Sequence, residues 1–344
     1  MPEPRPHAAA APGAGAALDD DPPAGRQSGR RRRLLMPAIA VLVVSLAGFL
    51  LYRTLSGYSL DEIVASVRSI PLPRLLAAGA FAAASYLCLT GFDWLGVRYA
   101  GRPLPYRKVA LASFVSLSIG HNVGLAALSS GAIRYRFYSR WGLKAGEVAK
   151  VILFCGMTVG LGLMLLGGAA MLLRSDLTGE ITGLPAALVL AAGAGCVALP
   201  LVYLVLAAYV RRPLRIRSFT LHFPPLRLAL GQLVIGPLNF AMVAGCLHQA
   251  LAAVADVSYM AVATVYVIAN VTALISHVPG GLGVIESVVV FLLPGAQLIG
   301  ALLVFRVIYF LVPLSLGGPA FAITELVFRR RAASSDGGGR RPES

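Results

Sequence analysis

Long apolar runs with almost no charge constrain this chain more than any other feature of its sequence. The stretches 149–173 and 184–210 are each longer than the roughly 20 residues that a helix needs to cross a bilayer. Charged residues make up only 13% of the chain, about half their share in a soluble domain. We therefore expect an all-α polytopic integral membrane protein and exclude a soluble enzyme, a disordered protein and a disulfide scaffold.

Two of the apolar stretches are interrupted in a way that the others are not. The stretch 109–131 contains Gly120-His121-Asn122 and Ser129-Ser130-Gly131, and the stretches 259–277 and 282–294 are separated only by 278–281. Breaks at membrane depth persist only where protein or a wet cavity surrounds them. We therefore predict two re-entrant, broken-helix segments in addition to about six full spans, at residues 34–52, 75–97, 149–173, 184–210, 228–250 and 297–325.

The ends of the chain differ in composition from this membrane domain. Residues 1–33 are rich in Ala, Pro, Gly and charge, which predicts a disordered basic tail, and residues 329–344 predict a second one. The run after Arg33 is long for a signal peptide and no small-residue cleavage site follows it, so we interpret it as a retained span. The transmembrane domain is then expected to cover residues 34–328.

The formal net charge of +15 is distributed as membrane topology requires. With both termini placed in the cytoplasm, 25 basic residues fall inside and 4 outside, in agreement with the positive-inside rule if both broken segments return to their starting side. This bias favours contact with anionic lipid headgroups and excludes nucleic acid as the partner. We expect a multi-pass protein of the bacterial inner membrane.

The two breaks resemble each other in sequence. Val115-Ser116-x-x-Ile119-Gly120-His121-x-x-Gly124 matches Val271-Thr272-x-x-Ile275-Ser276-His277-x-x-Gly280 at an offset of 156 residues without a gap. Together with their opposite expected topologies, the match indicates an inverted repeat, which transporters use to form a substrate site near mid-membrane. The alternative is two unrelated Gly/Pro kinks.

Several of these segments also resemble a known family. They are Leu-Thr-Gly-Phe-Asp at 89–93, Pro-Tyr-Arg at 105–107, Ser-Gly-Ala-Ile-Arg-Tyr-Arg-Phe-Tyr at 130–138, and Ile-Ser-His-Val-Pro-Gly-Gly-Leu-Gly-Val-Ile-Glu at 275–286. The chain is similar over residues 34–328 to the lysylphosphatidylglycerol synthase transmembrane region, the flippase half of the bacterial multiple peptide resistance factor. Only 19 residues follow residue 325, so the resemblance implies transport without the aminoacyl-transferring synthase domain.

Polar residues in and beside the breaks are the candidate substrate-binding residues. Guanidinium groups can hold a lipid phosphate bidentately, and glycines let the backbone present its N–H groups to an anion. Glu286 and Arg306 lie within apolar runs, where we expect them to face a polar cavity or each other. The full set is Asp93, His121, Asn122, Arg134, Arg136, His277, Gly280, Gly281, Glu286 and Arg306.

Each candidate also has a structural interpretation. Arg134 and Arg136 lie where positive-inside charges are routine, and a membrane His is more often a helix-packing residue. We expect no metal, because neither His has ligand spacing to another His and the four cysteines lie in apolar segments without C-x-x-C spacing. No nucleotide, lipase or metalloprotease motif is found, so neither a cofactor nor a catalytic residue is expected.

These observations favour a lipid flippase that moves an anionic or aminoacylated phospholipid, with membrane lipids as its partners. A second copy of the chain and a lipid-modifying enzyme are further candidate partners. Two other functions are kept open. One is proton-coupled transport of a small anion, and the other is a non-transporting membrane partner of a lipid-synthesis enzyme.

The predicted topology can be tested with single cysteines. After the native cysteines are replaced, a cysteine at Val254 should react with an impermeant thiol reagent added outside, and one at Leu214 only after permeabilisation. These positions lie in loops that the charge distribution assigns to opposite sides. The reverse labelling pattern would overturn the orientation and the inverted repeat with it.

Overall fold

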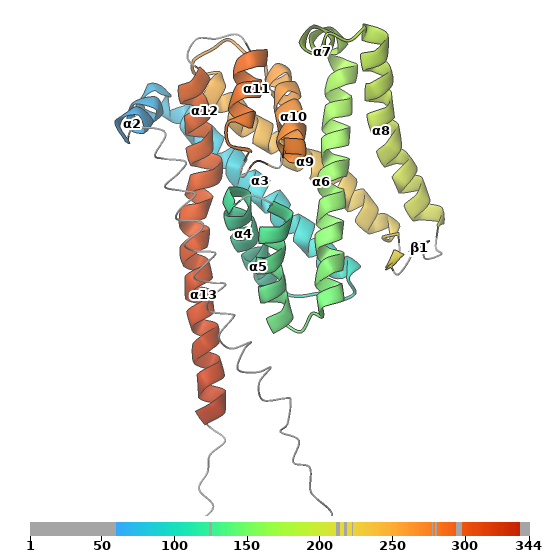
Figure 1. The fold of residues 1–344 in the computed structure, drawn as a ribbon, viewed down its shortest axis with the longest axis vertical. Coiled ribbons are helices and arrows are strands. Elements are labelled where there is room, and N and C mark those ends of the chain that lie inside the picture. The colour runs from blue at the N-terminus through green and yellow to red at the C-terminus, as the bar shows by residue number, and fades with distance from the viewer. Residues whose placement is uncertain are drawn as a thin grey trace, which may run out of the picture. The chain divides into compact units, whose positions relative to one another are not determined.

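The computed structural model describes residues 60–123, 126–210, 214–216, 219–221, 223–276, 278, 281–293 and 298–337. The predicted first span and N-terminal tail lie outside these residues, as do His277 and Gly280. The described chain is helical apart from one antiparallel two-stranded hairpin (Figure 1).

The elements follow one another in a simple order. They are α2 (Leu60–Ser69), α3 (Leu72–Tyr99), α4 (Tyr106–Val123), α5 (Ala126–Arg140), α6 (Ala145–Leu173), α7 (Ser175–Thr182), α8 (Ala186–Tyr209), β1 (Leu214–Ile216), β2 (Phe219–Leu221), α9 (Leu226–Leu251), α10 (Tyr259–Ser276), α11 (Val284–Leu292), α12 (Leu298–Arg306), the π-helix η2 (Val307–Leu311) and α13 (Val312–Gly337).

Prolines determine where three of the long helices begin. Pro71, Pro185 and Pro225 immediately precede α3, α8 and α9. A proline fits the start of a helix because its fixed φ is already helical and its missing N–H would have no partner there. The carbonyl oxygen of each proline accepts a hydrogen bond from the first turn of its helix, such as the Leu75 N–H to Pro71 O bond of 3.2 Å.

Six helices among the described residues have the length and hydropathy needed to cross a membrane: Leu72–Tyr99, Ala145–Leu173, Ala186–Tyr209, Leu226–Leu251, Tyr259–Ser276 and Leu298–Phe328. The all-helical membrane fold is thus confirmed. Five of the six correspond to predicted full spans, and the sixth, Tyr259–Ser276, is the segment predicted to be re-entrant. Its length alone permits a full crossing, so the re-entrant path stays a prediction.

The position of the first break differs from the prediction. Gly120, His121 and Asn122 lie inside α4, which ends at Val123, and Ser129–Gly131 lies inside α5, which begins at Ala126. Residues 124–125 lie outside the described residues. Gly120 serves close packing instead, because a Cβ there would lie 2.8 Å from Ser130 Cβ and 3.2 Å from the Ser130 backbone. In the second half, α10 ends at Ser276 and α11 begins at Val284, in agreement with the predicted interruption.

The C-terminal tail was predicted to begin at residue 329, but helix α13 extends beyond that point. Helix α13 continues through residues 329–337 and ends at Gly337. Arginine and alanine favour helix, and no proline or glycine interrupts the segment before Gly337, so the spanning helix extends past its apolar run.

Helices α3 and α9 form the centre of the bundle and pack antiparallel (Figure 1). A Cβ on Gly91 would meet the Ile235 side chain, and a Cβ on Gly245 would meet Phe81. Between these contacts, Ser85 Oγ donates a hydrogen bond of 2.7 Å to Asn239 Oδ1. The small residues let two helices that carry polar groups approach closely, as membrane helix interfaces require.

A second close approach joins α6 to α9, and it provides a test of the packing. A Cβ on Gly162 would lie 2.6 Å from the carbonyl carbon of Gly236, whereas nothing lies within 4 Å of a Cβ on Gly160 in the same helix. Gly162→Ala should therefore lower the free energy of unfolding by about 1–3 kcal/mol relative to Gly160→Ala, the cost expected for overpacking. Denaturant unfolding in detergent measures it; equal stabilities would contradict this packing.

Candidate functional site

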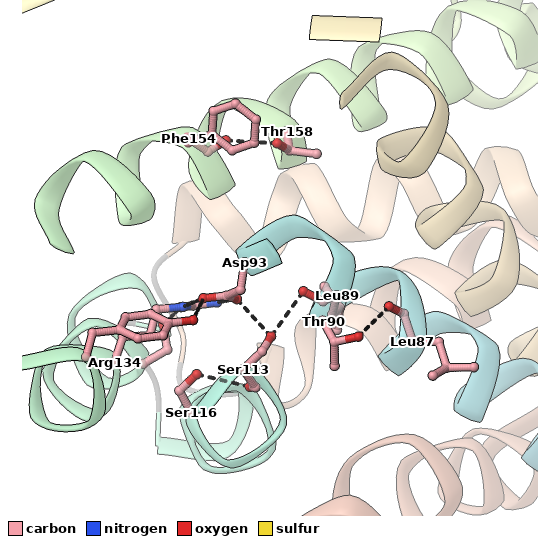
Figure 2. Close-up of polar contacts among 11 residues, drawn as sticks. Leu87, Leu89, Thr90, Asp93, Ser113, Ser116, Arg134, Phe154 and Thr158 are labelled. Carbon is pink, nitrogen blue, oxygen red and sulfur yellow. Dashed lines mark hydrogen bonds and ion pairs between the residues drawn. The ribbon is translucent and has the colours of Figure 1, made fainter. Parts of the chain in front are cut away.

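The first charged cluster is an ion pair between α3 and α5. Arg134 Nε donates to Asp93 Oδ1 and Arg134 Nη2 to Asp93 Oδ2, each at 2.8 Å. Figure 2 shows the guanidinium facing the carboxylate from the neighbouring helix. Asp93 is 0% exposed and Arg134 4% exposed. Two charges removed from water are retained only with such bidentate geometry.

Neighbouring hydroxyl groups complete this pair. Tyr138 donates its hydroxyl to Asp93 Oδ1 at 2.8 Å, and Ser113 Oγ donates to Asp93 Oδ2 at 2.8 Å. Arg134 Nη1 donates to Ser130 Oγ at 2.9 Å. The carboxylate therefore accepts four hydrogen bonds from α4 and α5, which ties the first broken segment to α3. The structure brings two predicted site residues together, and their contact with a substrate stays a prediction.

His121 and Asn122 lie at the end of α4, against the π-helix η2. The His121 ring stacks on Tyr309 with centroids 6.4 Å apart, and its Nδ1 has no hydrogen-bond partner among the described residues. Asn122 donates its amide to the carbonyl oxygens of Ser118, at 2.8 Å, and Phe310, at 3.3 Å. The amide of this candidate substrate-binding residue is thus bound to backbone carbonyls of both halves of the chain.

The second ion pair joins α11 to α12. Arg306 donates to both carboxylate oxygens of Glu286, with Nη2 to Oε2 at 2.8 Å, and Nη2 also donates to the Gly281 carbonyl at 3.0 Å. Glu286 Oε2 accepts the Gly283 N–H at 2.9 Å. Of the two arrangements considered from the sequence, the structure shows the residues facing each other.

Two glycines make this arrangement sterically accessible. Gly281 and Gly283 have φ values of +59° and +79°, in the left-handed region that favours glycine. Their backbone groups are engaged within the protein, because the Gly281 N–H donates to Val278 O at 3.0 Å and Gly283 donates to Glu286. The predicted anion-binding role of this turn therefore requires the turn to rearrange.

A third cluster was missed by the sequence analysis. Arg136 and Arg140 of α5 both bind Glu325 of α13, and Arg136 and Glu325 are buried. The sequence singled out Arg136 as a candidate, but neither Arg140 nor Glu325. Glu325 is the one carboxylate of the run 297–328, and a charge within an apolar run is the signal that identified Glu286.

A polar chain at the centre of the bundle was also not predicted. Ser85 Oγ lies 2.9 Å from the Tyr309 hydroxyl and donates to Asn239, so α3, α9 and η2 meet in one buried network. Residues 85, 239 and 309 meet only through tertiary packing, because 154 and 224 positions separate Ser85 from its two partners, so their network could not be identified from sequence. A π-helical turn such as η2 is often found at functional sites.

An open hollow of about 490 Å³ lies where α3 begins and α9 ends, lined by Arg74, His248 and Asp256. Within the described residues, no three His, Cys, Asp or Glu side chains gather as a metal site would require.

The fold and these clusters define a multi-pass helical membrane protein with buried ion pairs at its helix breaks. The chain belongs to the lysylphosphatidylglycerol synthase TM region family, whose sequence model matches residues 38–317. It is similar to uncharacterized protein slr0712 of Synechocystis sp., with 34% identity over 80% of this chain and 87% of that protein. Inner membrane protein YbhN of Escherichia coli is 29% identical over 80% of this chain and 88% of its own length.

The Glu286–Arg306 pair can be tested by a double-mutant cycle. Glu286→Gln and Arg306→Gln should each lower the free energy of unfolding by about 3–5 kcal/mol, because each leaves a buried charge without its partner. The double variant, with two neutral polar groups, should recover much of that loss. Thermal unfolding in detergent measures all four proteins, and two singles as stable as the parent would show that these residues are solvated.

Proposed function

We propose that this protein moves a polar lipid, of the phosphatidylglycerol or aminoacylated phosphatidylglycerol type, between the leaflets of a bacterial inner membrane. In this proposal both termini are cytoplasmic and the domain itself performs no synthesis. The observation that carries it is the Glu286–Arg306 pair, which lies at a helix break within the membrane domain. Ionisable residues inside spans, and the ends of broken helices, are where transporters bind substrate.

The chemistry of this pair fits an aminoacylated headgroup. Such a headgroup carries a phosphate, which a guanidinium binds bidentately, and an ammonium group, which a carboxylate binds. The Glu286 side chain is 18% exposed and the Arg306 side chain 7%, so the guanidinium is buried while the carboxylate is partly exposed. A headgroup could replace each partner of the pair with a group of the same charge.

The inverted repeat expected from the sequence completes this proposal. In transporters one repeat moves against the other around the substrate site, and here the two halves of the chain would move in that way around the Glu286–Arg306 pair.

The proposal is tested by lipid movement in reconstituted vesicles. Vesicles that contain the purified protein should transfer headgroup-labelled phosphatidylglycerol or lysylphosphatidylglycerol between leaflets faster than protein-free vesicles. The double variant Glu286→Gln/Arg306→Gln should fold and lose this acceleration, because its site lacks both charges.

A matched control is the exposed pair at the start of α6. Arg102 Nε lies 2.9 Å from Glu147 Oε1, so Arg102→Gln/Glu147→Gln removes the same two charges outside the proposed site and should keep transport. If the folded parent protein accelerates the transfer of no polar lipid between leaflets, the flippase proposal is contradicted. Normal transport by the Glu286/Arg306 double variant would instead assign that pair a purely structural role.

A further inference from the structure

Two arginine side chains of α5, Arg136 and Arg140, bind one carboxylate of α13, that of Glu325. Arg136 places Nε 2.9 Å from Glu325 Oε2 and Nη2 2.5 Å from Oε1. Arg140 places Nη1 2.9 Å from Oε2 and Nη2 3.1 Å from Oε1. Each carboxylate oxygen is therefore bound by both guanidinium groups, and each guanidinium binds bidentately.

This geometry is what a phosphodiester monoanion requires. A phosphodiester, like a carboxylate, presents two oxygens that share one negative charge, and the planar fork of arginine matches both groups. The four nitrogen–oxygen contacts at Glu325 would serve the two non-bridging oxygens of a lipid phosphate without a change in charge. Glu325 thus occupies a position that an external anion of the same charge could take.

The charge balance of the cluster points the same way. Two guanidinium groups meet one carboxylate, although one arginine would suffice to neutralise it. The arginines also contact aromatic rings, with Arg140 4.7 Å from the Phe328 centroid and Arg136 6.0 Å from that of Phe321. These rings stabilise the cations by cation–π attraction in addition to the carboxylate.

The surroundings of the cluster supply access and a source of ligand. Arg136 is buried, but the Arg140 side chain is 27% exposed, which opens one side of the cluster to the outside. Past Glu325, α13 continues into Arg329, Arg330 and Arg331. Runs of basic residues beside a span mark the surface where anionic headgroups collect. A lipid phosphate is therefore the external anion that this cluster would meet first.

We propose that Arg136 and Arg140 form a binding site for the phosphodiester of an anionic lipid, and that Glu325 is its built-in competitor. With Glu325 in place, α13 is clamped to α5 and the site is closed. When a lipid phosphate replaces Glu325, the clamp between the first broken segment and the C-terminal helix opens. This inference rests on the proposed function, since it assigns a lipid-loading site to the same protein.

The test is equilibrium binding of phosphatidylglycerol to the purified full chain in detergent, followed by native mass spectrometry. Glu325→Gln should lower the dissociation constant about tenfold, as expected if the parent site is free in about one molecule in ten. Adding Arg140→Gln should abolish the gain. Glu147→Gln, which removes an exposed carboxylate from the Arg102 pair, should leave binding unchanged.

Two further arms identify the ligand. Phosphatidylcholine has the same phosphodiester but a cationic neighbour, and inorganic phosphate lacks the lipid tails. A gain for phosphatidylglycerol alone supports an anionic lipid site, whereas competition by millimolar inorganic phosphate would assign the site to free phosphate instead. No gain for any of them in folded Glu325→Gln would overturn the proposal and leave Glu325 as a structural anchor.

A second readout does not depend on a Glu325 variant. Trp141 lies next to the cluster, with its ring 5.6 Å from Phe137 and 6.4 Å from Phe328. In a Trp94→Phe background, phosphatidylglycerol should shift the emission of Trp141 as α13 moves, and Arg140→Gln should remove the shift; an unchanged emission would count against the opening. Binding without transport in vesicles would refute the proposed function alone, and transport without this binding would refute the site alone.

Discussion

A charge inside a membrane domain must be paired, and in the part of the chain that the structure describes three such pairings determine how the helices lie. Asp93–Arg134 joins α3 to α5, Glu286–Arg306 joins α11 to α12, and Glu325 joins α13 to α5 through two arginines. Apolar packing against lipid gives little preference for one helix arrangement over another, because lipid tails are as apolar as leucine. Directional ion pairs supply that preference and connect each broken segment to a long helix.

The pairs differ in how completely they are enclosed, and this difference separates structure from function. Asp93 is 0% exposed and accepts four hydrogen bonds from three side chains, so exchange with a ligand would leave several donors unpaired. Glu286 and Arg140 have partly exposed side chains. Their pairs can exchange with an external group at lower cost, which makes them the candidates for contact with a lipid headgroup.

The sequence predicted the membrane class and most spans, because run length and hydropathy are local properties. It also singled out Glu286 and Arg306, since each is a charged residue within an apolar run. It could not pair Asp93 with Arg134 or Arg136 with Glu325, because residues 41 and 189 positions apart meet only through tertiary packing. The predicted helix break at Gly120 was wrong for a related reason. From sequence alone, a glycine that permits close helix contact cannot be distinguished from one that ends a helix.

The charge arrangement also bears on which lipids could cross. Separating Glu286 from Arg306 leaves two charges unpaired, and the loss of a buried partner costs about 3–5 kcal/mol. A purely anionic headgroup would compensate Arg306 and leave Glu286 without a partner, whereas an aminoacylated headgroup supplies both a phosphate and an ammonium group. Under the proposed function, Glu286 would therefore slow a simple anion such as phosphatidylglycerol relative to a headgroup that carries both charges, while the two-arginine cluster at Glu325 needs only a phosphate. If both sites act on one lipid, the two-arginine cluster at Glu325 selects for its phosphate, and the Glu286–Arg306 pair selects for its amine.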